Sequence, residues 1–203
     1  MPRNVVCISH TTGAGGEEVG RLVADRLGFI YVDEAVVARA AERGGVDPER
    51  VADEERRKSR LAGVLDYMAL AGGDVLGSPP PSGDMPSEAV RTFIRDAIQE
   101  VAARGNAVIV AHAASYAVGG DVRPLRVLIT APREARARRV ATAEGLDDLE
   151  ATRVLKKSDT GRADYLKRFY GVGEEMPIHY DLVVNTEALS VEQAAALVAQ
   201  AAA

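Results

Sequence analysis

Residues 5–20, VVCISHTTGAGGEEVG, have the composition and spacing of a site that binds phosphate. A short apolar run is followed by Gly13, Gly15 and Gly16, and then by apolar residues at helical spacing. A strand, a glycine-rich turn and a helix in this order direct backbone N–H groups and a helix N-terminus at an anion. The chemistry predicted for this segment is therefore the binding of phosphate groups.

The turn departs from the usual phosphate-binding pattern at its charged positions. That pattern, Gly-x-x-x-x-Gly-Lys-Ser/Thr, supplies a lysine to the β- and γ-phosphates and a hydroxyl to Mg²⁺. Aligned on Gly15, it places His10 at the first glycine, Gly16 at the lysine and Glu17 at the hydroxyl. Glu17 and Glu18 suit a helix dipole but repel phosphate unless a cation intervenes. A glycine-rich turn that binds nothing is the alternative interpretation.

Further charged residues on the predicted helices, and one after the second predicted strand, are candidates for phosphate or substrate binding. Arg136 and Arg139 share a helix face, which is either a phosphate clamp or a solvated surface. Asp159 has Arg162 three positions later on the same predicted helix, so these two side chains can pair with each other. Asp33 follows the second predicted strand, where it meets a ligand or caps the next helix.

Five short apolar runs have the character of parallel strands that are covered on both faces. These runs are residues 5–8, 29–32, 107–111, 125–130 and 182–184. Helical patterns separate them, most clearly over 87–104, after Pro132, and after the capping box of Ser190 and Gln193. This alternation predicts a doubly wound α/β fold with ligands outside the carboxyl ends of the strands. His10 and His112 would both lie there, as a phosphate grip when protonated or, less favoured, as metal ligands when neutral.

The composition restricts the possible classes of function. A chain of 203 residues with 47% hydrophobic and 4% aromatic residues predicts a single domain with an aliphatic core, to which the lone Cys7 contributes. The net charge of −5 argues against nonspecific nucleic-acid binding. We expect no signal peptide before the first strand, and no apolar run approaches the roughly 20 residues of a membrane span. We therefore expect a cytoplasmic protein without membrane contact.

With these elements placed, the chain resembles the cytidylate-kinase-like family of P-loop nucleoside monophosphate kinases over essentially its whole length. The resemblance begins with Ser9-His10 and continues in the loop from Gly13 to Val19, in Tyr31-Val32-Asp33 and in the third strand that ends at His112. The C-terminal signature is the most specific, and it comprises Lys157, Asp159, Arg162, Tyr165, Tyr170, Tyr180-Asp181-Leu182 and Asn185-Thr186. A glycine at the lysine position is usual in this family, whereas His10, Glu17 and His112 replace family arginines.

The resemblance implies a P-loop NTPase-like five-stranded parallel sheet with helices on both faces. Its core would comprise about 1–33, 105–145 and 178–203, with a helical acceptor-binding insertion over about 34–104 and a lid over about 146–177. It also implies ATP-dependent transfer of the γ-phosphoryl group, with Mg²⁺, to a nucleotide or similar small acceptor. Such reactions depend on positioning two anions in line and neutralising their charge.

Site residues follow from the same resemblance. The donor nucleotide would bind at His10, Thr12, Gly13, Ala14, Gly15, Gly16, Glu17 and Glu18. The acceptor would lie near Asp33, His112 and the helix over 87–104. The catalytic group would be Arg136, Arg139, Lys157 and Arg162, with Asp159 orienting an arginine or the acceptor. No set of metal ligands is expected from the protein itself.

Cations are lost at the loop but retained in the lid, so two classes of function remain open. One is a phosphotransferase with a relocated phosphate clamp. The other is a catalytically impaired nucleotide-fold protein that acts as a ligand sensor or protein-interaction module. A third possibility is a relationship to small-molecule kinases such as shikimate or gluconate kinase. These have the same architecture, but the C-terminal signature matches them less well. The Ala-rich C-terminal helix and the insertion offer surfaces for a homodimer.

Overall fold

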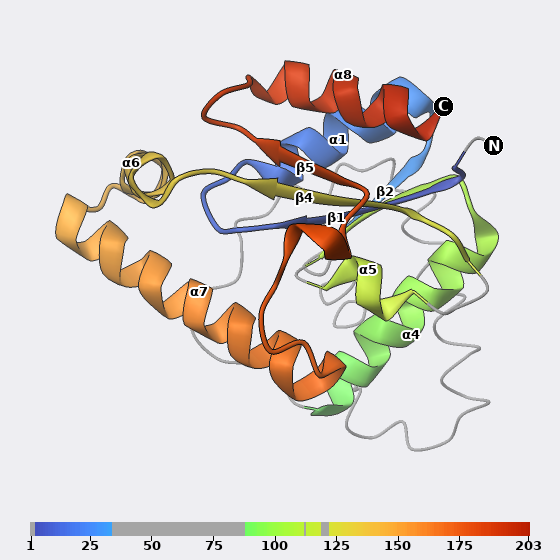
Figure 1. Ribbon diagram of the computed structural model, residues 1–203, viewed down its shortest axis with the longest axis horizontal. Helices are drawn as coiled ribbons and strands as arrows, with labels where there is room; N and C mark the ends of the chain where they lie inside the picture. Colours follow the sequence, from blue (N-terminus) through green and yellow to red (C-terminus); the bar gives the residue numbers. More distant parts are fainter. Residues whose placement is uncertain (1–2, 34–87, 112, 119–121) are drawn as a thin grey trace.

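The computed structural model describes residues 3–33, 88–111, 113–118 and 122–203 (Figure 1). The helices and the loop that we predicted between residues 34 and 87 lie outside the described residues, as does His112. The described chain nevertheless contains the whole predicted sheet and the glycine-rich turn.

Five parallel strands form one sheet in the order β2-β3-β1-β4-β5 (Figure 1). The strands are β1 (Val5–His10), β2 (Ile30–Asp33), β3 (Ala107–Val110), β4 (Leu125–Thr130) and β5 (Leu182–Asn185). All five predicted strands are confirmed, and β1 lies between β3 and β4 with Ile8 opposite Val110 and Val127. Strand β1 is longer than predicted, so His10 is its last residue, and β2 ends at Asp33.

Helices cover both faces of the sheet, as predicted. They are α1 (Gly16–Leu27), α4 (Glu88–Arg104), α5 (Ala114–Ala117), α6 (Arg133–Glu144), α7 (Asp148–Tyr170) and α8 (Val191–Ala202), with a short 3₁₀ helix at Pro177–His179. Helices α1 and α8 pack on one face and α4 and α5 on the other (Figure 1). Because side chains alternate along a strand, Val6 and Ile8 of β1 pack beneath α1 and α8, whereas Val5 and Cys7 pack toward α4.

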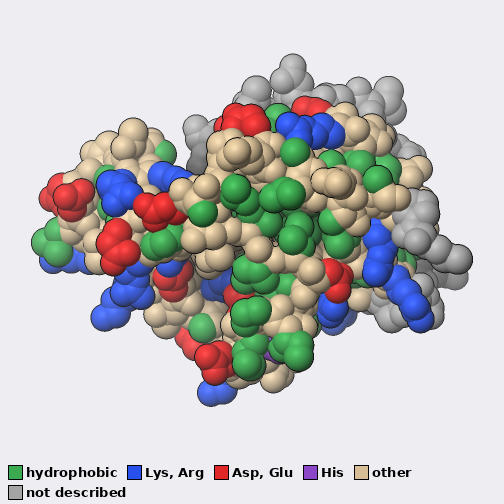
Figure 2. All heavy atoms as spheres, turned by 45° about the horizontal axis from the view of Figure 1, so that its top comes forward, with side chains coloured by type: hydrophobic (Ala, Val, Ile, Leu, Met, Phe, Trp, Pro, Cys, Tyr) green, Lys and Arg blue, Asp and Glu red, His purple; other side chains and the backbone are tan. Residues whose placement is uncertain are grey.

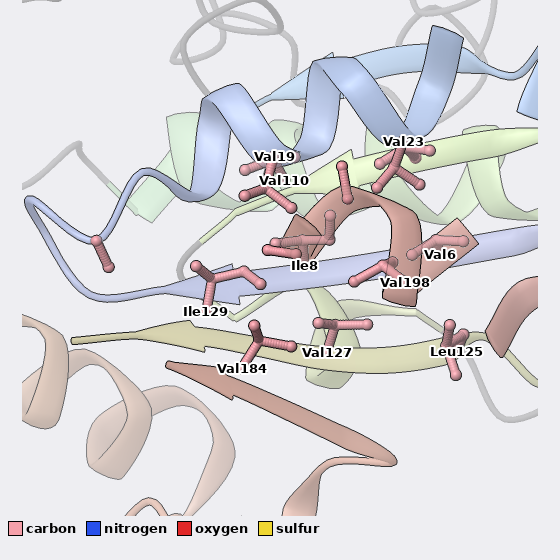
Figure 3. Close-up of a cluster of buried hydrophobic side chains, with 14 of the residues drawn as sticks. Val6, Ile8, Val19, Val23, Val110, Leu125, Val127, Ile129, Val184 and Val198 are labelled. Atoms are coloured by element: carbon pink, nitrogen blue, oxygen red, sulfur yellow. The ribbon is translucent and has the colours of Figure 1, made fainter. Parts of the chain in front are cut away.

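The core beneath α1 and α8 is aliphatic (Figure 3). Val19 and Val23 of α1 and Val198 of α8 meet Ile8 and Ile129 of the strands. Val19, Val23, Val198, Ile8 and Ile129 are all fully buried. This packing fixes the start of α1 above the end of β1, which is what positions the glycine-rich turn.

Helix α6 and the start of α7 project beyond the carboxyl ends of the strands, and α7 then runs back below the sheet to end beside α4 (Figure 1). Helix α7 begins with a capping box, in which the Asp147 carboxylate accepts from the Glu150 N–H and the Glu150 carboxylate accepts from the Asp147 N–H. Charges of both signs are mixed over the visible side of this projecting part (Figure 2). No helix in the described part of the chain is long and apolar enough to cross a bilayer.

Candidate functional site

The glycine-rich turn joins β1 to α1 at the carboxyl edge of the sheet. Gly13 and Gly15 have φ angles of 78° and 77°, in the left-handed region that favours glycine. A Cβ on Gly13 would lie 2.8 Å from the carbonyl oxygen of Arg136, so the turn also packs tightly on α6. Gly15 is the N-cap of α1, and no side chain caps the helix there. The first N–H groups of α1 are therefore suited to receive an anion.

His10 lies against the backbone of Gly16. A Cβ on Gly16 would come within 2.3 Å of both Cβ and Cγ of His10 and within 2.8 Å of its Cδ2. No side chain fits at position 16 while His10 keeps this conformation. The glycine at the lysine position is thus a packing requirement of this chain.

The side chain of Glu17 runs along α1 to Arg21. Its carboxylate lies 4.0 Å from the Arg21 guanidinium, which in turn lies 3.7 Å from the buried Asp33 carboxylate. Arg21 also covers the ring of Tyr31 at 4.9 Å from its centroid. Burial and the nearby Asp33 carboxylate raise the pKa of Tyr31. Arg21, which the sequence did not single out, is therefore a cation that offsets the charge of Glu17 and Asp33.

Arg136 is buried, and each of its three guanidinium nitrogens donates to the protein. It donates from Nη1 and Nη2 to the two carboxylate oxygens of Asp159, at 2.9 and 2.8 Å. Its remaining bonds go to the carbonyl oxygens of Thr12 at 3.2 Å and Ala131 at 3.1 Å. Two alternatives from the sequence are therefore wrong. Arg136 is not on a solvated face, and Asp159 pairs with Arg136 and not with Arg162, whose guanidinium is equally buried but is held by another carboxylate, Glu175.

Arg162 has a partner that sequence reasoning missed. Its Nε and Nη2 donate to the Glu175 carboxylate at 2.9 and 2.5 Å, and its Nη1 donates to the carbonyl of His10 at 3.1 Å. The Tyr180 hydroxyl also donates to Glu175. Burial opposes the charge of Arg162, but the bonds to Glu175 outweigh it and raise the pKa of Arg162. Burial and Glu175 likewise raise the pKa of Tyr180.

Arg139 binds the other side of the turn. It donates to the hydroxyl of Thr186 at 2.9 Å, to the Thr186 carbonyl at 2.7 Å and to the Gly13 carbonyl at 3.3 Å. The Thr186 hydroxyl donates in turn to the carbonyl of Ala14 at 2.8 Å. The sequence marks Thr186 as part of the C-terminal signature. Its role in holding the glycine-rich turn was not predicted.

The described structure thus brings most of the predicted site residues together. Arg136, Arg139 and Arg162 each bond a carbonyl oxygen of the segment from His10 to Gly13. The Thr12 and Ser158 hydroxyls share a hydrogen bond of 2.5 Å between the turn and α7. Lys157, by contrast, lies on the exposed side of α7. Glu175 belongs to no sequence motif and lies in the irregular segment after α7. Its pairing with Arg162 could not be predicted, because only the folded chain brings the two side chains together.

A small hollow lies between α4, α5 and α7, beyond the end of β3. It is lined by Arg95, Ile98, Ala111, Ala113, Ala117, Tyr165 and Tyr170. The rings of Tyr165 and Tyr170 lie 6.0 Å apart, and Tyr116 meets Tyr170 at 5.6 Å. Ala111 precedes His112, so the hollow lies in the region where the sequence places the acceptor.

Comparisons with known proteins agree with this architecture. A cytidylate kinase from Roseiflexus castenholzii is 28% identical to this chain over 225 residues, which cover 96% of this chain and 91% of that protein. An uncharacterised protein from Eubacterium ventriosum superposes with a TM-score of 0.67 at 16% identity, covering 98% of this chain and 97% of that one.

A shikimate kinase from Acinetobacter baumannii, solved with shikimate, superposes with a TM-score of 0.51 at 15% identity and covers 99% of this chain and 92% of its own. At these identities the two structures show the fold alone, which is P-loop kinase-like. The model of the cytidylate kinase-like family matches residues 5–188. Because this match spans most of the sequence, the chain belongs to the cytidylate kinase-like family.

Proposed function

We propose that the protein is an ATP-dependent phosphotransferase whose acceptor is a nucleoside monophosphate. The observation that carries the proposal is the convergence of Arg136, Arg139 and Arg162 on the turn between β1 and α1. Cations around a helix N-terminus are what the transfer of a phosphoryl group requires, because the reaction proceeds chiefly by positioning and charge neutralisation.

The described residues fit the phosphates of a donor nucleotide. The uncapped start of α1 and the left-handed Gly13 and Gly15 supply backbone donors in a tight turn. No group of three or more His, Cys, Asp or Glu side chains gathers in the described ranges as a metal site. Mg²⁺ would therefore be held mainly by the nucleotide phosphates, and it would supply charge neutralisation when bound. The arginines would orient the phosphates and exclude water.

The hollow between α4 and α7 is the proposed acceptor site. The rings of Tyr165 and Tyr170 are tilted by 58° to each other, and the face of either ring could stack on a nucleobase, while Arg95 offers a cation for the acceptor phosphate. The relative from Roseiflexus castenholzii is named a cytidylate kinase, so cytidine monophosphate is the first acceptor to test.

A second candidate function rests on the pairing of the arginines. Arg136 and Arg162 each give two donors to a carboxylate, Asp159 and Glu175 respectively. Arginines held in this way bind a further anion only if it displaces or shares the carboxylate. In a protein-interaction module or ligand sensor these pairs would serve only to hold α7 on the turn.

The test combines calorimetry with turnover. We expect ATP with Mg²⁺ to bind with a dissociation constant on the order of 1 μM, or about −8 kcal/mol, and ADP to form when nucleoside monophosphates are added. Arg95→Ala should raise the KM for the acceptor and leave ATP affinity unchanged. Arg104→Ala, at the far end of the same helix, is the matched control and should change neither. Absence of ATP binding up to millimolar concentration would favour the interaction module.

A further inference from the structure

We propose that His10 supplies, from the end of β1, the side-chain contact to the donor phosphates that ordinary phosphate-binding loops take from a lysine on the helix. In this exchange the large side chain moves from position 16 to position 10, and it is sterically possible only because residue 16 is glycine. The inference rests on the proposed function, since it concerns the same nucleotide. His10 would take the place of the loop lysine, and its position against the helix start would be the reason for the glycine at position 16.

The exchange is visible in the two positions themselves. The ordinary pattern has glycine at position 10 and lysine at position 16. This chain has the bulky residue at position 10 and glycine at position 16. A Cβ at position 16 would point into the Cβ and Cγ atoms of His10, each 2.3 Å away. The histidine side chain thus occupies the space through which a lysine side chain would have to leave the helix.

The backbone of His10 is held from several directions. His10 pairs with Ile129 in the register of β1 and β4, and the next N–H, of Thr11, donates to the Ile129 carbonyl at 3.2 Å. The His10 carbonyl accepts from Arg162 at 3.1 Å. This anchoring keeps the side chain of His10 against Gly16 at the start of α1. An imidazole carries an N–H donor in either charge state, so it can add a side-chain donor to the backbone donors of the helix start.

Binding measurements test the role of His10 directly. Calorimetry with MgATP and, separately, with inorganic tripolyphosphate is carried out on the wild type and on His10→Ala, which should bind both probes about tenfold more weakly. The exchanged variant His10→Gly with Gly16→Lys should return to within about threefold of the wild type. The control variant His10→Gly with Gly16→Ala relieves the same clash without a cation and should remain weak.

The outcomes separate this inference from the proposed function. Equal MgATP affinity of His10→Ala and wild type would overturn the role of His10 and leave the phosphotransferase standing. Tripolyphosphate binding that depends on His10, without ATP binding, would support the role of His10 and count against the phosphotransferase. Binding of neither probe by the wild type would overturn both.

A stability measurement tests the steric part independently of any ligand. Gly16→Ala should lower the Tm by roughly 2–10 °C in the wild-type background, because the new Cβ meets His10. The same change in a His10→Gly background should leave the Tm of that background unchanged or raise it. An equal fall in both backgrounds would overturn the steric coupling of positions 10 and 16.

Discussion

Arg136 and Asp159 join helices α6 and α7 through a two-point ion pair, with donor–acceptor distances of 2.9 and 2.8 Å. The same guanidinium bonds the carbonyl of Thr12, so the pair also fixes the turn that begins α1. Since the side chain of Arg136 is 8% exposed and that of Asp159 is 26% exposed, the two charges depend on each other. The ion pair is therefore both part of the fold and part of the proposed phosphate site.

Breaking this pair should be costly from either side. We expect Asp159→Asn to lower the free energy of unfolding by about 1–3 kcal/mol, because it leaves a buried guanidinium without its countercharge. Arg136→Met combined with Asp159→Leu should cost clearly less than the sum of the single changes. Urea denaturation of the wild type, Arg136→Met, Asp159→Leu and the double variant measures this coupling, and strictly additive losses would contradict it.

Arg162 should be irreplaceable by lysine. Lysine has a single charged nitrogen on a flexible chain, whereas Arg162 bonds both oxygens of Glu175 and the carbonyl of His10 through three nitrogens fixed in one plane. We expect Arg162→Lys to reduce turnover about 100-fold, which is the cost of removing one donor that stabilises the transition state. Arg168→Lys, on the exposed side of the same helix, is the control and should have wild-type turnover. Unchanged turnover in Arg162→Lys would remove this arginine from the phosphate site.

The sheet was predictable from the sequence because its physical cause is local. Parallel strands covered on both faces are short, continuous apolar runs, and each of the five runs forms a strand. The errors fell at strand ends. His10 and Asp33 are polar, yet they continue the hydrogen-bonded register of β1 with β4 and of β2 with β3.

The partners of the arginines were not predictable from spacing. Asp159 and Arg162 are neighbours on one helix, but each binds a group from another segment, and those choices depend on which side chains the fold buries. The bond from Arg139 to Thr186 spans 47 residues and exists only because β5 ends beside the turn. The steric fit of His10 on Gly16 likewise needed coordinates, although both residues were already conspicuous in the sequence.

The pair of Asp181 and Arg126 gives a pH dependence of stability. The Arg126 guanidinium bonds both carboxylate oxygens, and these bonds lower the pKa of Asp181 below its ordinary 3.8. Because the folded pKa is the lower one, the stabilisation is present above the ordinary carboxyl pKa and is lost as the pH falls through the folded value.

Asp181→Asn should therefore be less stable than the wild type at pH 7 by up to about 1 kcal/mol, since the pair is partly exposed. The difference should shrink as the pH falls below about 4. Urea denaturation between pH 3 and pH 7 measures it. A difference that stays constant over this range would mean that the ion pair is not its source.

Gly20 and Gly161 should respond to alanine with opposite signs, although both lie inside helices. A Cβ on Gly20 of α1 would lie 2.5 Å from Cγ2 of Val110 and 3.1 Å from Cε2 of Tyr31. We expect Gly20→Ala to lower the free energy of unfolding by about 1–3 kcal/mol, because the close packing of α1 on the sheet leaves no space for a methyl group.

Gly161 of α7 is the matched control, since no described atom lies within 4 Å of a Cβ built there. Gly161→Ala should raise the free energy of unfolding by about 0.5–1 kcal/mol, the ordinary preference of a helix for alanine over glycine. Chemical denaturation of both variants decides the matter. If Gly20→Ala proved as stabilising as Gly161→Ala, α1 would not be packed on β3 as closely as the Val110 contact requires, and the position of the turn above β1 would lose its structural basis.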